Sequence, residues 1–290
     1  MIVLPDHPCL DTPQVTRFAP SPTGYLHLGH AYSAAYAKAL ADRSGGQYLV
    51  RIEDIDRNRS KLMFETAIYE DLQFLGLSPS GPPVRQSDRM AAYATALEAL
   101  VQQGLTYPCF CTRAEIAQAG GAPHGPDGPV YPGTCKGLRQ DEVNTRLAAG
   151  DRPAIRLDLE KAMAASGPLT FTEIDGAEGH GAGLHAADPT ALGDVVVARK
   201  DVPVSYHLAV VVDDAAQGVT LVTRGADLFF ATPVHRLLQA VLELPEPLYA
   251  HHRLVRDGTG RRLAKRADDL SVHAMREAGA RRDEILARLG

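Results

Sequence analysis

The sequence is poor in cysteine, has no long apolar segment and carries no excess of positive charge. Four cysteines among 290 residues are too few for a disulfide framework. No run of about 18 apolar residues occurs and no charged-then-apolar signal begins the chain, so we expect a cytoplasmic protein without a membrane partner. The formal net charge is -5, so a nucleic-acid partner would have to be held by a local basic patch.

What the sequence does contain is a regular order of predicted elements, without internal repeats. A strand is predicted over residues 15–19, a helix over 28–43 that stops at a glycine pair, and a second strand over 47–52. A strand, a crossover helix and a strand in this order predict a parallel pair. Two further amphipathic helices are expected, over residues 60–75 and 87–103.

Composition changes after residue 107, where the chain becomes dense in glycine and proline. This stretch is too irregular for a core layer and too long for an ordinary loop. Apolar and β-branched residues like those of the first predicted strands return over 195–198 and 208–213, where we expect further strands. We therefore predict an α/β fold, a doubly wound parallel sheet split by an inserted α+β subdomain. The expected parts are a loose N-terminal tail (1–14), the first half of the sheet domain (15–107), the inserted subdomain (108–192), the second half (193–250) and a C-terminal segment (251–290).

The strongest local signal is RFAPSPTGYLHLGH over residues 17–30, where the first predicted strand ends and the first predicted helix begins. Unpaired backbone N–H groups and the helix dipole favour an anion at such a junction. Gly29 lets a ligand approach the backbone closely. His27 and His30 can donate hydrogen bonds to phosphate oxygens as charge builds during a displacement at phosphorus. The motif therefore indicates a nucleotide-phosphate site.

These residues resemble the HIGH signature of the class I glutamyl-tRNA synthetases, written HLGH here. Further motifs of that family are resembled by RIEDIDR, YH, RGADL and RLAKR, at residues 51–57, 206–207, 224–228 and 262–266. The resemblance covers most of the chain from Val15 to about Leu270. It implies a Rossmann-like catalytic domain, the chemistry of an ATP-dependent ligase and an insertion that contains zinc.

A glutamate pocket can also be argued from the side chains. Glutamate carries two carboxylates and one ammonium, so its pocket needs fixed cations and at least one anion. Arg17 and Arg224 can offer bidentate donors to a carboxylate, and Glu53 can accept hydrogen bonds from the ammonium. Ser21 and Tyr206 can add neutral hydrogen bonds. The resemblance implies the glutamate-binding role for Arg17, Ala19, Ser21, Glu53, Tyr206 and Arg224.

The segment GRRLAKR, residues 260–266, resembles the mobile KMSKS loop of the same family. A flexible basic loop that closes over a triphosphate stabilises the charge that moves onto pyrophosphate. Lys265 occupies the second lysine of the pattern and is the expected catalytic cation, whereas Arg262 stands for the first lysine and Ala264 replaces the serine. Mg²⁺ is expected to accompany ATP. The expected catalytic residues are His27, His30 and Lys265, and the expected ATP-binding residues are these three and Gly29.

Three cysteines on turn-rich backbone, Cys109, Cys111 and Cys135, form a candidate structural zinc site. In a reducing compartment such a cluster favours a metal over a disulfide. Zinc takes four ligands in structural sites, so one position remains open. His124 is the chemically more usual donor, but the resemblance points to Tyr131, which we favour because that family can use a tyrosine there. Three free thiols without a metal are the other alternative.

The narrower function depends on the length of chain beyond the KMSKS-like segment. A full glutamyl-tRNA synthetase continues into a helical domain that reads the anticodon, whereas here a short stretch leads to Gly290. This plan resembles the glutamyl-Q tRNA(Asp) synthetase family, in which L-glutamate is activated with ATP and attached to queuosine, the wobble nucleoside of tRNA(Asp). The expected partners are L-glutamate, ATP and the anticodon loop of tRNA(Asp), with a monomer favoured. The alternatives are a minimal glutamyl-tRNA synthetase that charges the 3′ end of tRNA, and a non-catalytic tRNA-binding paralogue.

Overall fold

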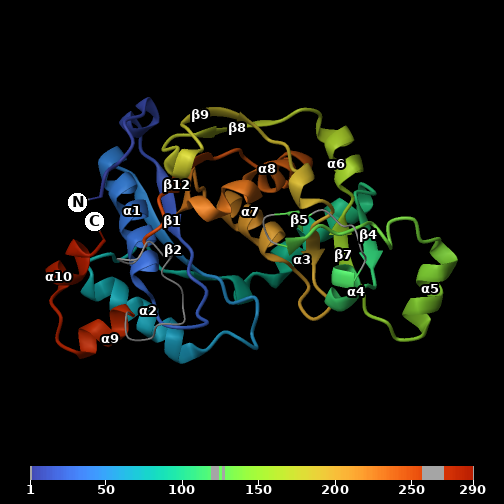
Figure 1. The fold of residues 1–290 in the computed structure, drawn as a ribbon, viewed down its shortest axis with the longest axis horizontal. Coiled ribbons are helices and arrows are strands. Elements are labelled where there is room, and N and C mark those ends of the chain that lie inside the picture. The colour runs from blue at the N-terminus through green and yellow to red at the C-terminus, as the bar shows by residue number, and fades with distance from the viewer. Residues whose placement is uncertain (1, 119–123, 126–127, 257–270, 290) are drawn as a thin grey trace.

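A parallel sheet covered by helices forms the centre of the computed structural model, which describes residues 2–118, 124–125, 128–256 and 271–289 (Figure 1). This arrangement confirms the expected α/β fold. No helix in these described ranges is long and apolar enough to cross a membrane.

The first half of the sheet contains the expected parallel pair and a second crossover, from β2 to β3, that the sequence pattern did not predict. β1 pairs in parallel with β2 from Val15 opposite Gln47 to Phe18 opposite Val50, and β2 pairs in parallel with β3. The strands are β1 (Val15–Phe18), β2 (Gln47–Ile52) and β3 (Val84–Arg85). The helices are α1 (Leu28–Ser44), α2 (Leu62–Phe74) and α3 (Met90–Gln102).

Four more strands form a sheet in the order β11, β12, β8, β9, and this sheet lies against β1 on its other side. The Thr220 N–H donates to the Val15 carbonyl, and β11 lies beside β1. The chain runs on from β1 to β2 on one side and from β11 to β12 on the other. The order of the strands therefore reverses between β1 and β11, which is where open α/β sheets bind ligands. The elements are β11 (Leu221–Gly225), β12 (Leu248–His252), β8 (Thr170–Glu173), β9 (Gly183–Ala186), α7 (Tyr206–Ala216) and α8 (Thr232–Val241).

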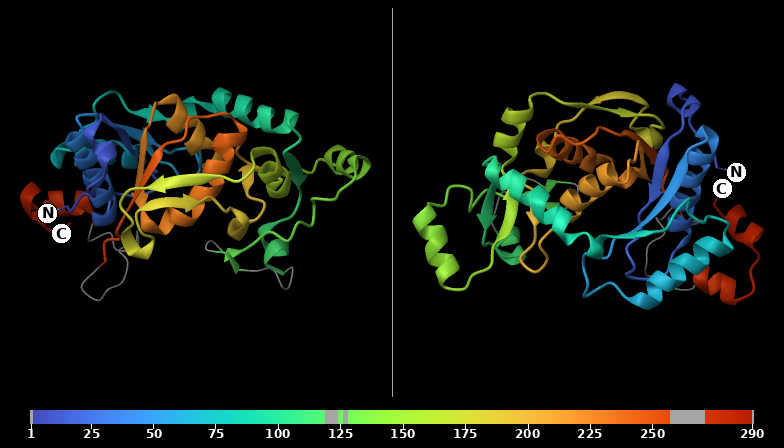
Figure 2. Two further views of the ribbon diagram at one scale, coloured as in Figure 1. Left: turned by 90° about the horizontal axis from the view of Figure 1, so that it is seen from above. Right: turned by 180° about the vertical axis from the view of Figure 1, so that it is seen from behind.

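A second, antiparallel sheet has β7 between β4 and β10. Figure 2 shows this sheet and its helices at the opposite end of the molecule from α9 and α10. The segment 108–192 contributes to both sheets, because β8 and β9 belong to the central one. The elements are β4 (Thr106–Cys109), β5 (His124–Gly125), β6 (Gly128–Pro129), β7 (Ala154–Leu157), β10 (Val196–Ala198), α4 (Arg113–Gln118), α5 (Gln140–Ala148), α6 (Leu159–Ser166), α9 (Val272–Glu277) and α10 (Arg282–Ala287).

One strand expectation was wrong, and another was right about the strand but wrong about its sheet. The run Leu208 to Asp213 lies inside helix α7. Periodicity alone cannot separate a short apolar strand from a buried helix, and α7 packs against α3, α8 and β10. The run over 195–198 does contain strand β10, but this strand pairs antiparallel with β7 and lies outside the parallel sheet.

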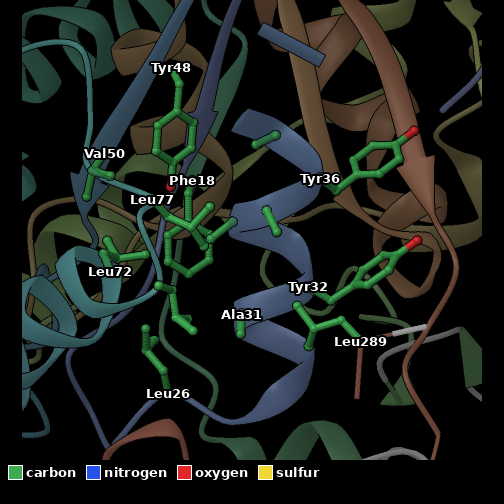
Figure 3. Close-up of a cluster of buried hydrophobic side chains, with 14 of the residues drawn as sticks. Phe18, Leu26, Ala31, Tyr32, Tyr36, Tyr48, Val50, Leu72, Leu77 and Leu289 are labelled. Carbon is green, nitrogen blue, oxygen red and sulfur yellow. The ribbon is translucent and has the colours of Figure 1, made fainter. Parts of the chain in front are cut away.

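The largest hydrophobic cluster surrounds α1 (Figure 3). Ala31 and Ala37 are completely buried, so the helix backbone lies close to its neighbours. Figure 3 shows Phe18 on one side of α1, and Tyr32 and Tyr36 on the other. The core therefore fixes both β1 and α1, whose junction carries the HLGH motif. The C-terminal helices join this cluster through Val272, Met275, Ile285 and Leu289.

Candidate active site

A cavity of about 450 Å³ opens at the carboxyl ends of β1 and β11, where the sheet changes direction. Lys265 lies outside the described residues. Of the residues described before and after Lys265 in the chain, Val255 lines the cavity and Ser271 forms a β-bridge with His27. The other residues that the sequence indicated for glutamate and ATP all line this one cavity: Arg17, Ala19, Ser21, His27, Gly29, His30, Glu53, Tyr206 and Arg224.

The turn between β1 and α1 is held by its two histidines. His27 is the N-cap of α1, and its Nδ1 accepts the His30 N–H, while the His30 Nδ1 accepts the His27 N–H, each at 3.3 Å. The rings stack with centroids 3.7 Å apart. Because Nδ1 accepts in both rings, each neutral ring carries its proton on Nε2. A Cβ at Gly29 would lie 2.9 Å from His27 Cε1, so glycine leaves room for this ring at a helix N-terminus that favours anions.

Arg17 ends β1 and is held by an ion pair. Its Nε and Nη2 donate to the two carboxylate oxygens of Asp214 at 3.0 and 3.3 Å, and its Nη1 donates to the Thr223 carbonyl at 2.7 Å. A guanidinium has five N–H groups. Three of these groups have partners among the described residues, and two remain for a ligand. The Asp214 carboxylate is in direct contact with the guanidinium.

Asp214 is shared with a second buried arginine, Arg51, which is 0% exposed. Arg51 Nη1 donates to Asp214 at 2.6 Å and Nη2 donates to Glu53 at 3.3 Å. Burial acts to raise the pKa of Asp214, but the guanidinium groups of Arg17 and Arg51 outweigh it and lower that pKa. The sequence interpretation gave Asp214 no role. The available signal was the pair Asp213-Asp214 in an apolar run, since carboxylates are seldom buried unless they are paired.

Glu53 follows β2, and its backbone N–H donates to the Pro20 carbonyl at 3.0 Å, which fixes it beside the β1–α1 turn. Its side chain is 12% exposed. Burial raises the pKa of Glu53, against the lowering effect of Arg51 and Arg17. A cation that entered the cavity would favour the charged form of this carboxyl group. Glu53 is therefore suited to bind an ammonium.

Arg224 ends β11 and is held by neutral partners. Its Nε donates to His251 Nε2 at 2.9 Å, its Nη1 to His235 Nδ1 at 2.9 Å and its Nη2 to Thr232 Oγ1 at 2.6 Å. Burial, with the Arg224 charge nearby, lowers the pKa of His251 to about 4 and that of His235 well below its ordinary range. Arg224 therefore keeps a positive charge that no described carboxylate contacts directly. Such a guanidinium suits the carboxylate of a ligand.

Tyr206, at the start of α7, separates this cavity from a larger one of about 920 Å³. Arg113, Arg156 and Lys200 give the larger cavity a basic wall. Two buried polar atoms in its lining, Arg156 Nε and Ser205 Oγ, have no hydrogen-bond partner among the described residues. A buried polar atom without a partner calls for a water, an ion or a ligand. The sequence interpretation gave this lining no role beyond Tyr206.

The cysteine cluster lies beside the antiparallel sheet. The Sγ atoms of Cys109, Cys111 and Cys135 lie within 4.8 Å of one another. The Tyr131 hydroxyl lies 3.7 Å from Cys111 Sγ and accepts the Cys135 N–H at 2.7 Å. Three thiols and a phenol oxygen in one cluster are a donor set that fits a tetrahedral zinc ion. The alternative ligand, His124, belongs to strand β5.

Comparisons with known proteins agree in matching the chain to tRNA synthetases. The chain matches the family described as tRNA synthetases class I (E and Q), catalytic domain, over residues 14–290. It is 47% identical to the glutamyl-Q tRNA(Asp) synthetase of Rhodobacter capsulatus, over 95% of this chain and 99% of that protein. It is 42% identical to the protein of that name from Nitratidesulfovibrio vulgaris, over 91% of this chain and 81% of that protein.

Among solved structures, the chain resembles a glutamate tRNA ligase from Elizabethkingia meningosepticum in complex with its amino acid, with a TM-score of 0.72 and 29% identity. The alignment covers 88% of this chain and 52% of that ligase. The chain therefore spans about half the length of this solved relative.

Proposed function

The chain belongs to the class I tRNA synthetase family of the E and Q type, and from this membership we propose that it activates L-glutamate with ATP and transfers the glutamyl group to queuosine at the wobble position of tRNA(Asp). The protein is an aminoacyl-tRNA-synthetase-like ligase. The observation that carries the amino-acid part of the proposal is the single cavity lined by Arg17, Glu53 and Arg224. The acceptor part rests on the names of the relatives.

Glutamate fits the charges of this cavity. Arg224 receives one carboxylate, because its charge is not balanced by a direct ion pair. Arg17 adds its two remaining N–H groups, and Glu53 binds the ammonium. The other wall residues in this proposal are Ala19, Ser21 and Tyr206.

In the first step, an oxygen of the glutamate α-carboxylate attacks the α-phosphorus of ATP. The bond between the α-phosphorus and the bridging oxygen breaks, pyrophosphate leaves, and a mixed anhydride is formed. His27 and His30 donate from Nε2 to the phosphate oxygens beside the N-terminus of α1, which is close to the backbone at Gly29. Lys265 is proposed as the cation that stabilises the negative charge developing on the leaving pyrophosphate. Mg²⁺ bound with ATP would supply further positive charge there.

In the second step, a hydroxyl of the cyclopentene-diol of queuosine attacks the carbonyl carbon of the anhydride. The bond from this carbon to the phosphate oxygen breaks, AMP leaves, and the hydroxyl proton passes to solvent. The larger cavity beyond Tyr206 supports entry of an RNA from that side, because Arg113, Arg156 and Lys200 offer positive charge to phosphates. Donor and acceptor would then meet at Tyr206.

We also propose a division of labour along the chain. Residues 15–107 and 193–250 carry the cavity residues, residues 251–290 add Lys265, and residues 108–192 supply the metal cluster and the edge of the central sheet. Zinc held by Cys109, Cys111, Tyr131 and Cys135 would tie the end of β4 to the segment before α5 and add to its stability.

Two measurements test this function. Glutamate-dependent exchange of pyrophosphate into ATP is expected without tRNA, and its absence would make the chain a binding protein. Labelled glutamate is then supplied with ATP and one of three RNAs: tRNA(Asp) with queuosine, tRNA(Asp) with unmodified guanosine, or tRNA(Glu). Label is expected in the first RNA alone, and digestion to nucleosides is expected to find it on queuosine.

A second candidate is a minimal glutamate–tRNA ligase that charges the 3′ end of tRNA. It is favoured by the likeness to the solved glutamate tRNA ligase. Label on the terminal adenosine of tRNA(Glu), with queuosine unlabelled, would establish this candidate and overturn the first.

A further inference from the structure

Arg224 is the end of a buried relay that begins on a strand from another part of the chain. Glu173 ends β8, His251 lies on β12, and both are 0% exposed. The Glu173 carboxylate lies 2.5 Å from His251 Nδ1, and His251 Nε2 lies 2.9 Å from Arg224 Nε. A carboxylate, an imidazole and a guanidinium are therefore connected by two successive hydrogen bonds, and the guanidinium lines the cavity.

The chemistry of this line allows one tautomer of His251. A guanidinium can only donate, so Nε2 of His251 must carry a lone pair toward Arg224. The proton of the neutral ring is then on Nδ1, where the Glu173 carboxylate accepts it. Burial acts to raise the pKa of Glu173, but the hydrogen bonds from His251 and from backbone N–H groups lower it on balance, which keeps this carboxylate an acceptor.

Backbone donors fix the Glu173 carboxylate in turn. Its Oε1 accepts the N–H groups of His251, Asp175 and Gly176 at 2.9, 3.1 and 3.3 Å. Oε2 is left to face the imidazole. The orientation of the Glu173 carboxylate is thus set by main-chain N–H groups of strand β12 and of the turn after β8.

We propose that Glu173 and His251 are positioning residues for the amino-acid substrate: together they hold the Arg224 guanidinium so that its remaining N–H groups receive the substrate carboxylate. This inference rests on the proposed function of the cavity. The negative charge of Glu173 is one imidazole away from Arg224, so no carboxylate of the relay contacts the guanidinium directly. A direct ion pair, such as that between Arg17 and Asp214, would compete with the substrate for the guanidinium.

The isosteric variant Glu173→Gln should reverse the relay. The three backbone N–H groups require an acceptor at the Oε1 position, so the glutamine oxygen takes that place and its NH₂ group faces His251 Nδ1. The ring must then accept at Nδ1 and carry its proton on Nε2, which opposes the Arg224 Nε–H. Two donors cannot share a hydrogen bond, so Arg224 must move.

The first test reads the tautomer and needs no substrate. Protein labelled with ¹⁵N in its histidines is observed by two-bond ¹⁵N–¹H correlation, with the His251 signals assigned by their loss in His251→Gln. The wild type is expected to show a protonated Nδ1 and a bare Nε2. A protonated Nε2 in the wild type would overturn the relay, whatever the enzyme's activity.

The second test separates positioning from general structure. Glu173→Gln is expected to raise the KM for glutamate in pyrophosphate exchange by about tenfold or more, the effect of losing one charged hydrogen bond, with the KM for ATP and kcat within about threefold. The matched control is Asp175→Asn in the same turn, whose carboxylate accepts from the Tyr36 hydroxyl at 2.6 Å, and it should leave both KM values unchanged. Equal rises in both KM values, or an unchanged KM for glutamate, would refute the proposal. Lack of exchange in the wild type would instead refute the proposed function and leave the tautomer result standing.

Discussion

At the scale of single residues, the two arginines of the cavity differ in what holds them. Arg17 donates to the carboxylate of Asp214, whereas Arg224 donates to two imidazoles and a hydroxyl. Arg17 is in direct contact with a carboxylate before a ligand arrives, and Arg224 has no such contact among the described residues. The cavity therefore attracts a carboxylate chiefly toward Arg224.

This difference makes Arg224→Lys a costly change. A lysine ammonium is a compact charge that cannot reproduce the planar donors that reach Thr232, His235 and His251. We expect the KM for glutamate to rise about tenfold to a hundredfold, corresponding to about 1.5–3 kcal/mol for a charged hydrogen bond. Steady-state pyrophosphate exchange measures it. Arg139→Lys, at a side chain that is 78% exposed, serves as the control, and an equal effect of both changes would contradict the assigned role.

The fourth metal ligand can be settled with two single substitutions. If Tyr131 completes the cysteine cluster, Tyr131→Phe is expected to lose most of the zinc that the wild type holds, because the phenol oxygen is removed while the ring remains. His124→Ala should then keep its zinc. Mass spectrometry of metal content per chain decides between them, with Cys111→Ser as the variant that should lose the metal in either case. Loss of zinc in His124→Ala alone would transfer the role to His124.

At the scale of elements, the sequence predicted best where the signal is local. The strands and helices of residues 15–103 carry clear periodicity with turn residues between them, and they form as expected. Helix α7 was taken for a strand, because an apolar run buried on several sides has no polar face to reveal its period. The pairing of β10 with β7 is a contact between distant segments, which no local pattern records.

In the site too, local motifs were predictive and contacts between distant segments were not. The residues that local motifs indicated for glutamate and ATP, Lys265 apart, line one cavity, because they lie at the ends of neighbouring strands and at the starts of α1 and α7. Their buried partners were missed: Asp214, Glu173 and His251 come from other elements, and their spacing in the chain gives no hint of contact. A carboxylate in an apolar run is the one local clue, and it names no partner.

The contact between the start of β2 and the segment before β1 gives a prediction about packing. A Cβ at Gly46 would lie 1.9 Å from the Gln14 carbonyl oxygen, so Gly46→Ala must displace backbone. Overpacking of this kind costs about 1–3 kcal/mol, to be measured by urea unfolding. Gly81→Ala is the matched control, since nothing lies within 4 Å of the added Cβ there. Equal stability of the two variants would contradict the close approach.

The contact between α2 and α9 gives a prediction about pH. Asp71 is completely buried, neither of its oxygens has a hydrogen-bond partner among the described residues, and Arg276 Nε lies 3.7 Å away. Burial raises the pKa of Asp71 to about 7, although Arg276 lowers it. The unfolded pKa of an aspartate is about 3.9. Because the folded pKa of Asp71 is higher, its contribution to the free energy of unfolding is present in full only when the pH is below about 3.9. This contribution is lost as the pH rises through about 7.

Asp71→Asn cannot titrate, so the difference in stability between wild type and variant should move against the wild type from pH 4 to pH 8. Thermal unfolding across this range measures it. The exposed Asp42, whose side chain is 62% exposed, provides the control Asp42→Asn, which should follow the wild type at every pH. Parallel curves for wild type and Asp71→Asn would show that Asp71 ionises normally.

At the scale of the whole molecule, two cavities of different character meet at Tyr206. The smaller one is lined by residues of the central sheet, and the larger one has a basic wall on an otherwise acidic protein with a formal net charge of -5. We therefore expect amino-acid activation and RNA binding to be separable by substitution. Such separation is not expected if one surface served both.

Arg113→Ala tests this separation, because Arg113 is exposed and its loss should not disturb folding. Transfer of glutamate to tRNA is expected to fall severalfold. Its salt dependence should weaken too, since the logarithm of the binding constant to a single strand changes by about 0.7 per phosphate contact for each tenfold change in salt. Pyrophosphate exchange without tRNA should stay at the wild-type level. A loss of both activities, or of neither, would contradict a separate RNA surface.

Strand β1 is joined to the residue before β11 by a hydrogen bond from the Val15 N–H to the Thr220 hydroxyl, and these residues stand 205 positions apart in the chain. On the ribosome, β1 emerges long before the strand that covers its open edge exists. A contact so distant in sequence closes slowly, and an uncovered strand edge in the meantime invites pairing with other nascent chains. Newly made protein should therefore depend on chaperones until β11 has been synthesised, and a release of the chain before that point should yield aggregates.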